Sequence, residues 1–304
     1  MNLLTDINYI HDLLARHGFR FSKSLGQNFL TASWVPEDIA ESAGLNENTG
    51  VLEIGAGVGC LTRELSARAG KVVCVELDRA LEPILAETLI GCKNVEMVYG
   101  DILKQDIPAL VAEKLNGLRP VVCANLPYNV TSPLLTALIE AGCFESITVM
   151  IQREVARRIC SKPGTADYGA FGIFVQWYEE PELLFDVPPS CFVPQPKVTS
   201  SVIRLKRREE HPAEVKDEKL MFRIIRAAFN QRRKTLVNAI SSQLGEITKD
   251  QAERALAECG YDPRIRGEVL DISGFAKISD KILAIINTDL WLKCIEKMAL
   301  YVIS

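Results

Sequence analysis

Histidine is scarce in this 304-residue chain: His11, His17 and His211 are the only ones. None of them lies close in sequence to residues 125–128, which form the candidate site. We therefore do not expect catalysis by a histidine base or a histidine-activated nucleophile. The nine cysteines include no Cys-x-x-Cys pair, and Cys74 and Cys123 stand inside apolar runs. An odd, unpatterned set of thiols favours a reducing cytoplasm over a disulfide framework or a zinc site, and we expect no metal.

Long apolar runs are missing as well. No stretch approaches the ~18 residues that a membrane helix needs, and the N-terminal region carries Asp6 and Asp12 instead of a basic segment. We expect no membrane span, no signal peptide and a cytoplasmic protein. Repeats and low-complexity segments are also absent, and the net charge of −4 does not by itself indicate a nucleic-acid partner. With 48% hydrophobic residues, the composition is that of a globular protein of about two domains.

The stretch Asn125-Leu126-Pro127-Tyr128 is the most informative one. It follows Pro120–Ala124, a β-branched run that reads as a buried strand, so it lies where open α/β sheets place their ligand chemistry. The Asn125 amide oxygen and a backbone carbonyl held by Pro127 provide two acceptors for an exocyclic amino group, and Tyr128 offers a flat face for a planar ring. The alternative is an ordinary turn at a strand end.

A glycine-rich turn follows an earlier predicted strand. Val51–Ile54 leads into Gly55-Ala56-Gly57-Val58-Gly59 and a helix from about Leu61, which lets a ligand approach the backbone closely. The dinucleotide-binding fingerprint requires glycine where Cys60 stands. The turn therefore indicates a nucleoside cofactor other than NAD.

Acidic residues end the next two predicted strands, at 71–75 and 95–98. Glu76 lies about 20 positions beyond the glycine turn, where a carboxylate can accept both hydroxyls of a ribose. The matching glycine turn favours this interpretation over an exposed acid at a strand end. Asp101 could accept a hydrogen bond from an adenine amino group. The alternation of strands and helices up to this point predicts a parallel, doubly wound sheet.

The remaining part of the first domain continues this alternation. We expect a helix over 133–139, a strand over 147–151, a helix over 152–159 with Arg153 and Arg157 along one side, and a strand over 198–205. Upstream, the apolar residues Leu25, Phe29 and Leu30 flank Gln27 and Asn28. They suggest a loop that is anchored to the rest of the domain by its apolar side chains. Before it, Ile7, Ile10, Leu13 and Leu14 form an amphipathic helix that ends near Gly18.

A charged, proline-containing stretch at 206–218 resembles an interdomain linker. Beyond it the pattern is helical over 219–230, 233–244, 248–259 and 273–286, which predicts a small all-α domain. Between residues 220 and 245 there are five cations and no acid, which favours a phosphate-facing surface over a solvated helix face. They are Arg223, Arg226, Arg232, Arg233 and Lys234.

With these pieces in place, the chain resembles the rRNA adenine-N6 dimethyltransferase family, most closely its KsgA/RsmA branch, which acts on small-subunit rRNA. The resemblance covers roughly residues 20–285, and its eight motifs occur in the family's order. They are Ser24–Leu30, Val51–Thr62, Val75–Arg79, Gly100–Leu103, Asn125–Leu135, Gln152–Arg157, Phe192–Leu205 and Arg232–Leu236.

The resemblance implies a class I (Rossmann-like) methyltransferase that uses S-adenosyl-L-methionine. It places Asn28 and Leu30 over the cofactor, Gly55 at its methionine end, Glu76 on its ribose and Asp101 on its adenine. Asn125 would lie between the cofactor and a target adenine, which Tyr128 and Phe192 would stack on. The target would be two adjacent adenosines in the 3′-terminal hairpin of 16S rRNA in an immature particle.

In domain terms we expect a catalytic domain over 1–205, with 1–24 as an N-terminal helix and arm, and an rRNA-contacting domain over 219–285. We expect Arg153 and Arg157 of the catalytic domain to contact rRNA phosphates together with the five cations of the second domain. The tail 286–304, with Trp291, Ile295, Met298 and Tyr301, is unassigned. We expect a monomer. Three alternatives stay open: a large-subunit methylase of the antibiotic-resistance type, a non-catalytic RNA-binding assembly factor, and a small-molecule methyltransferase.

Overall fold

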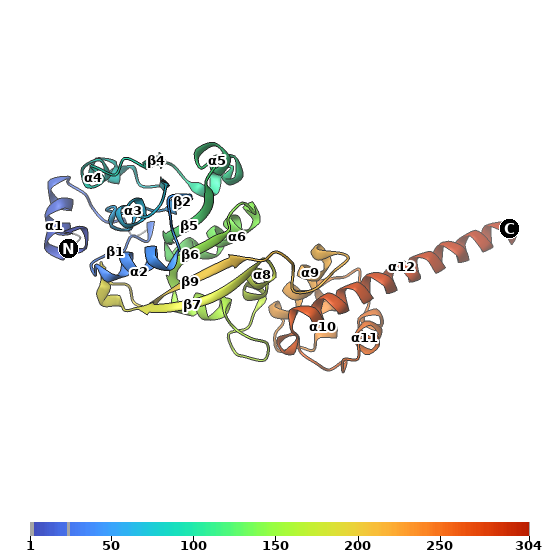
Figure 1. The fold of residues 1–304 in the computed structure, drawn as a ribbon. Coiled ribbons are helices and arrows are strands. Elements are labelled where there is room, and N and C mark those ends of the chain that lie inside the picture. The colour runs from blue at the N-terminus through green and yellow to red at the C-terminus, as the bar shows by residue number, and fades with distance from the viewer. Residues whose placement is uncertain (1–2, 23–24, 304) are drawn as a thin grey trace. The chain divides into compact units, whose positions relative to one another are not determined.

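The computed structural model describes the backbone of residues 3–22 and 25–303, and side chains through residue 289 and at Trp291 and Leu292. Ser24, the first residue of one predicted motif, lies outside the described residues, as do the side chains of the tail from residue 293 onward. The chain forms two compact units (Figure 1). The first comprises Met1–Cys160 and Tyr178–Arg208, and the second comprises Ser161–Trp177 and Glu209–Ser304.

A seven-stranded sheet forms the core of the first unit, in the order β4-β3-β2-β5-β6-β9-β7. The first five strands of this order are parallel, whereas β9 pairs antiparallel with both β6 and β7. The strand order reverses between β2 and β5, and ligands of open α/β sheets bind at such a switch point. The strands are β2 Thr49–Ile54, β3 Lys71–Glu76, β4 Val95–Tyr99, β5 Arg119–Asn125, β6 Ser146–Gln152, β7 Glu179–Val187 and β9 Ser200–Arg207.

The helices of the first unit follow the strands in alternation, as predicted. Because β2 and β5 are buried between them, these strands read as continuous apolar runs instead of alternating ones. The helices are α1 Ile7–Arg16, α2 Trp34–Ser42, α3 Cys60–Ser66, α4 Glu82–Thr88, α5 Ile107–Lys114, α6 Thr131–Ala141 and α7 Arg153–Ile159. Short 3₁₀ turns of this unit are η1 Leu3–Thr5, η3 Arg79–Leu81, η4 Ile102–Lys104, η5 Tyr128–Val130 and η6 Pro189–Cys191.

A second, two-stranded sheet joins segments that are far apart in sequence. Strand β1, Phe29–Leu30, pairs antiparallel with β8, Phe192–Val193. All four side chains except that of Val193 are buried in the core. This pairing fixes the segment that precedes β1 over the carboxyl ends of the main strands.

The second unit is helical, as predicted. Its helices begin at side-chain caps: Asp217 accepts from the Leu220 amide, Thr235 from Asn238, and Thr248 forms a capping box with Gln251. Its elements are α8 Ala170–Tyr178 (up to Trp177), α9 Glu218–Asn230, α10 Leu236–Gln243, α11 Lys249–Glu258, η7 Gly267–Val269 and α12 Ile272–Ile303. The red end of α12 runs past the other helices of this unit (Figure 1).

Three features differ from the expectations. Helix α8 and strand β7 were not predicted, because neither shows a clear period: α8 is apolar on most sides and β7 carries Glu179, Glu182 and Asp186. Residues 161–177 belong to the second unit, so the expected border at residue 205 describes only one of three crossings between the units. The last helix continues to Ile303, well beyond the expected end at 286.

Candidate functional site

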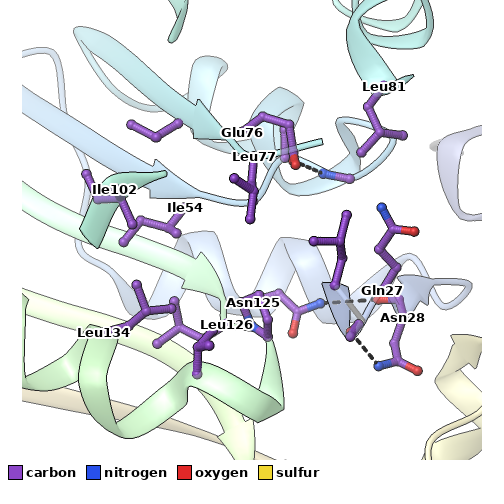
Figure 2. Close-up of a pocket in the computed structure, with 18 of the residues that line it drawn as sticks. Gln27, Asn28, Ile54, Glu76, Leu77, Leu81, Ile102, Asn125, Leu126 and Leu134 are labelled. Atoms are coloured by element: carbon purple, nitrogen blue, oxygen red, sulfur yellow. Dashed lines mark hydrogen bonds between the residues drawn. The ribbon is translucent and has the colours of Figure 1, made fainter. Parts of the chain in front are cut away.

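A cavity of about 220 Å³ opens where the carboxyl ends of β2, β3 and β5 meet (Figure 2). It is lined by the loops that follow these strands and β4, and by the segment Leu25–Leu30. Nine of the residues predicted for cofactor and catalysis line it together. They are Asn28, Leu30, Gly55, Glu76, Asp101, Asn125, Leu126, Pro127 and Tyr128.

The glycine turn shapes one wall of the cavity. Gly55 has φ +79°, and a Cβ at this position would meet no atom within 4 Å, so a side chain here would project into open space. Gly57, with φ +56°, lies so close to the Phe29 ring that a Cβ would approach it to 3.2 Å. The left-handed backbone at both positions favours glycine and leaves room for a ligand against the main chain.

Glu76, the last residue of β3, presents a nearly buried carboxylate. Its Oε1 accepts the Asp78 amide at 2.8 Å and its Oε2 accepts the Gly57 amide at 3.3 Å. Burial raises the pKa of Glu76, and these two backbone donors oppose that rise. Each oxygen retains a further lone pair, which suits a partner with two hydroxyl groups.

Asp101 and its neighbours also line the cavity. The Asp101 carboxylate caps η4 by accepting the Leu103 amide at 3.0 Å with Oδ1. Ile102 is buried, while Leu77 and Leu103 are partly exposed and line the same cavity. Asp101 Oδ2 has only a long ion pair, at 3.9 Å, with the exposed Lys104. Apolar side chains beside such a carboxylate suit a flat heterocycle carrying an amino group.

Asn125 is the last residue of β5 and faces the segment Leu25–Leu30 (Figure 2). Its Nδ2 donates to the Asn28 carbonyl at 3.5 Å, so its Oδ1 remains an acceptor. The next residue is held from behind, since the Leu126 amide donates to the Met150 carbonyl at 3.1 Å. No described residue donates to the Leu126 carbonyl. Asn125 Oδ1 and the Leu126 carbonyl are therefore two acceptors on consecutive residues that line the cavity.

Tyr128 is half-buried, and its hydroxyl is hydrogen-bonded to the hydroxyl of the buried Ser200 at the start of β9. Burial raises the pKa of Tyr128, and the bond to Ser200 opposes this. The phenol therefore stays protonated at neutral pH, and its ring has a fixed orientation at the cavity. Sequence reasoning missed Ser200, because nothing near it in the chain suggests such a role.

The stacking prediction for Phe192 is wrong in this conformation. Phe192 is only 2% exposed, belongs to the hydrophobic core and is absent from the cavity lining. Its backbone pairs with Leu30, which turns its side chain into the core. Phe192 thus supports the segment over the cavity instead of lining the cavity itself.

The predicted RNA-contacting cations fall into two groups. Arg153, Arg223 and Arg232 are engaged with carboxylates: Arg153 lies 3.6 Å from Asp186, and Arg223 pairs with Glu246. The others are exposed and have no ion pair among the described residues. They are Arg157, Arg226, Arg233 and Lys234.

Arg232 is the clearest correction. Its guanidinium donates to Glu268 Oε2 at 2.7 Å and to the carbonyls of Ala166 and Thr165 at 2.8 and 3.1 Å. The amide of Gly164 also donates to the Glu268 carbonyl, at 2.7 Å. Arg232 therefore holds loop 161–169 against the second unit's helices, and three of its five N–H donors are already in use. The acids that pair with Arg223 and Arg232 are Glu246 and Glu268, which lie outside 220–245. They could therefore not be identified from the sequence of the cluster alone.

Within the described ranges, no group of histidine, cysteine and carboxylate side chains could hold a metal ion. A search of the same ranges for a helix able to cross a membrane found none.

Comparison with known proteins adds the following. The family model "Ribosomal RNA adenine dimethylase" matches residues 18–258. "Ribosomal RNA small subunit methyltransferase A" of Geobacillus thermodenitrificans is 47% identical over 90% of this chain and 94% of its own length. The protein of the same name from Clostridium perfringens is 46% identical over 91% of this chain and 98% of its own.

Solved structures share the fold. The 23S rRNA methyltransferase ErmE superposes with a TM-score of 0.64 at 28% identity, covering 84% of this chain and 99% of that one. A dimethyladenosine transferase from Plasmodium falciparum superposes with a TM-score of 0.67 at 24% identity, covering 82% and 95%.

Proposed function

Since the chain belongs to the ribosomal RNA adenine dimethylase family, we propose that it transfers methyl groups from S-adenosyl-L-methionine to N6 of adenosine in small-subunit rRNA. The finer proposal is that it dimethylates two adjacent adenosines in the 3′-terminal hairpin of 16S rRNA, within an immature particle. The observation that supports this best is the pair of acceptors formed by Asn125 Oδ1 and the Leu126 carbonyl beside the cavity.

The cavity suits the cofactor at each of its parts. The open space at Gly55 would take the methionine portion, and the Glu76 carboxylate would accept the two ribose hydroxyls. Asp101 would accept from the adenine amino group while Leu77 and Ile102 cover the ring. Asn28 and Leu30 would close the site. When bound, S-adenosyl-L-methionine supplies a methyl group on a positively charged sulfur.

The acceptor pair makes a poor nucleophile usable. The lone pair on an adenine N6 is delocalised into the ring, so the amino group attacks weakly. Asn125 Oδ1 and the Leu126 carbonyl would accept its two N–H bonds, which turns the lone pair out of the ring plane toward the methyl group. Asn125 Oδ1 and the Leu126 carbonyl would hold N6 toward the methyl group supplied by the cofactor, which would leave as S-adenosylhomocysteine with the electrons of its methyl–sulfur bond. N6 would release its proton to solvent.

These acceptors would also stabilise the positive charge that develops on N6 during transfer. Positioning and charge stabilisation of this kind can supply most of the acceleration, so a strong base is not needed. The side chains that line the cavity include no histidine, which agrees with such a mechanism.

The target adenine must leave its base stack to reach this site, at a cost of a few kcal/mol. Tyr128, whose hydroxyl is held by Ser200, offers a ring of fixed orientation for the extruded base to stack on. Stacking on an aromatic ring recovers about 1–3 kcal/mol. Phe192 would serve from behind the site by supporting β1.

The exposed cations are the better candidates for phosphate contacts. We assign this role to Arg157 in the first unit and to Arg226, Arg233 and Lys234 in the second. Arg153 and Arg223 would have to exchange a carboxylate partner for a phosphate. Arg232 would have to give up its hydrogen bonds to loop 161–169. Such contacts position the enzyme without reading sequence, and the folded particle would supply the specificity.

The test is complementation of a bacterial strain that lacks its own small-subunit dimethyltransferase. This chain should restore dimethyladenosine at the two 16S sites, and mass spectrometry of the digested rRNA reads them directly. Dimethyladenosine on 23S rRNA instead would favour the function named for ErmE. No methylation, together with corrected subunit assembly, would favour an assembly factor.

Contact by the free cations is tested by binding of the full chain to immature small subunits. Converting Arg233 and Lys234 to alanine should flatten the dependence of log affinity on log salt by about one unit for each lost phosphate contact. Affinity for S-adenosylhomocysteine should not change. An unaltered salt slope would remove these two residues from the RNA-contacting surface.

A further inference from the structure

We propose that Gln27 is a positioning residue that couples the ribose end of the cofactor site to the target-adenine end; this rests on the function proposed above. Gln27 lies in the segment Leu25–Leu30, all of whose residues line the cavity. Neither the glycine turn nor the Asn125 stretch contains it. Figure 2 shows it beside Asn28, across the cavity from Glu76.

Both ends of the Gln27 amide are in use. Its Nε2 donates to Asp78 Oδ2 at 2.6 Å, and its Oε1 accepts the Ser22 amide at 2.9 Å. The side chain is partly buried, so solvent is a poor substitute for these partners. Gln27 therefore joins the segment before β1 to the loop after β3.

Asp78 passes this constraint on to the ribose site. Its Oδ1 accepts the Ala80 amide at 3.0 Å and caps η3, which leaves Oδ2 for Gln27. Its own amide donates to Glu76 Oε1 at 2.8 Å. The carboxylate proposed to hold the ribose is thus connected to the Gln27 side chain through Asp78 alone.

The same segment reaches the target-adenine site on its other side. The Asn28 carbonyl accepts Asn125 Nδ2, the bond that leaves Asn125 Oδ1 free as an acceptor. Gly26, with φ +65°, lies against Asn129 and Pro127, where a Cβ would approach Asn129 Oδ1 to 3.0 Å. A shift of the segment would therefore disturb the orientation of Asn125.

The two ends are connected through one short piece of chain. Holding the segment against Asp78 keeps Asn28 placed for Asn125, and releasing it loosens both sites together. Gln27 thus acts on the reaction through Asp78 and Asn28 and contacts no reacting atom. We expect its loss to lower both cofactor affinity and the rate of methyl transfer.

The test reverses the direction of the hydrogen bond between residues 27 and 78. In Gln27→Glu a carboxylate faces the Asp78 carboxylate, and this like-charge contact should displace the segment. In the double variant Gln27→Glu with Asp78→Asn, the new carboxylate can accept from both the Ser22 amide and the new side-chain amide opposite it. The oxygen of that side-chain amide can still cap Ala80. Every donor keeps an acceptor, and the total charge equals that of the wild type.

The full-length chain is measured in three ways: affinity for S-adenosylhomocysteine by calorimetry, amide hydrogen exchange of residues 25–30 without ligand, and single-turnover methyl transfer to immature small subunits. Gln27→Glu should weaken binding by about tenfold or more, speed exchange of the segment and slow transfer. The double variant should return all three to within about threefold of wild type. Gln243→Glu, at an exposed glutamine of the second unit, should match wild type throughout.

Wild-type binding and exchange in Gln27→Glu would overturn the proposal, and so would a double variant as impaired as the single one. Failure of the proposed function looks different. In that case rRNA would not be methylated by any variant, while the pattern of binding and exchange would stand.

Discussion

The two units of this protein use their polar side chains in contrasting ways. In the first unit, polar groups lie at the ends of parallel strands and are held by backbone donors and acceptors, as Glu76 is by the amides of Gly57 and Asp78. In the second unit, cations crowd one stretch of sequence, yet Arg232 is locked by a carboxylate and two carbonyls while Arg233 beside it is exposed.

This contrast shows when residues that are predicted together from the sequence also form one site in the folded protein. The carboxyl ends of neighbouring parallel strands share one edge of a sheet, so motifs far apart in the chain converge there by topology alone. No such rule governs a helix corner, where adjacent side chains point in different directions and meet different partners. The residues predicted for cofactor binding and catalysis therefore line one cavity, whereas three of the predicted RNA-contacting cations are paired with carboxylates.

The largest effect should come from Asn125. Asn125→Ala should lower single-turnover methyl transfer by about 10²–10³-fold, because it removes an acceptor that acts mainly as charge develops on N6. Affinity for S-adenosylhomocysteine should stay within a few-fold of wild type. Asn116→Ala, at an exposed asparagine between α5 and β5, is the matched control. Rapid transfer by Asn125→Ala would refute the proposed mechanism.

Arg232 should have the next largest effect, on stability. Arg232→Ala removes three hydrogen bonds of a charged donor and should lower the free energy of unfolding by about 2–3 kcal/mol. Urea denaturation of the full chain measures this. Arg226→Ala and Arg233→Ala, at exposed positions, should lie within about 0.5 kcal/mol of wild type. Equal stability of all three variants would erase the distinction between Arg232 and its neighbours.

The buried carboxyl group of Glu53 extends the comparison to a second position within the first unit. It is fully buried in β2, and its carboxyl oxygens have no hydrogen-bond partner among the described residues. Burial raises the pKa of Glu53 to about 8, whereas a glutamate in the unfolded chain has its usual pKa near 4.5. Between these values the folded state holds a proton that the unfolded state has released, so stability falls as the pH rises.

The expected loss is about 1.4 kcal/mol per pH unit inside that window, or about 2 kcal/mol between pH 6 and 8. Glu53→Gln mimics the protonated form and should remove this dependence, and urea denaturation across pH 5–9 will compare the two proteins. Glu37→Gln, at an exposed carboxyl on α2, should follow the wild-type curve. Parallel curves for wild type and Glu53→Gln would show that Glu53 is ionised in the folded protein.

Glu76 should give the smallest of these effects, on binding. Glu76→Gln should weaken S-adenosyl-L-methionine binding by about 1.5 kcal/mol, roughly tenfold, since a charged acceptor for the ribose is lost in ground and transition states alike. Burial raises the pKa of Glu76, so the wild-type affinity should decline as the pH is lowered toward that raised pKa, and the decline should be weaker in the variant. Calorimetry at several pH values decides this, and unchanged affinity would remove the ribose assignment.

The sequence by itself determined much of the first unit. Strands ending at Ile54, Glu76 and Asn125 were predicted within a residue or two, because buried parallel strands are continuous apolar runs and glycine or polar residues end them. The helices of the second unit that lie beyond residue 217 followed from their periodicity. The cavity residues could be named in advance because parallel topology places strand ends together.

Only the tertiary structure decided the rest. Phe192 is aromatic and follows a motif, yet pairing of β8 with β1 buries it. The motifs that contain Ser200 and Asp78 do not reveal the partners of these residues, because Tyr128 and Gln27 reach them across 72 and 51 positions of the chain. Residues 161–177 fold with the second unit, since Arg232 and Glu268 bind their backbone. A residue's partner is set by distance in space. A sequence pattern predicts which residues are close in space only where the topology is regular, as it is at the ends of neighbouring parallel strands.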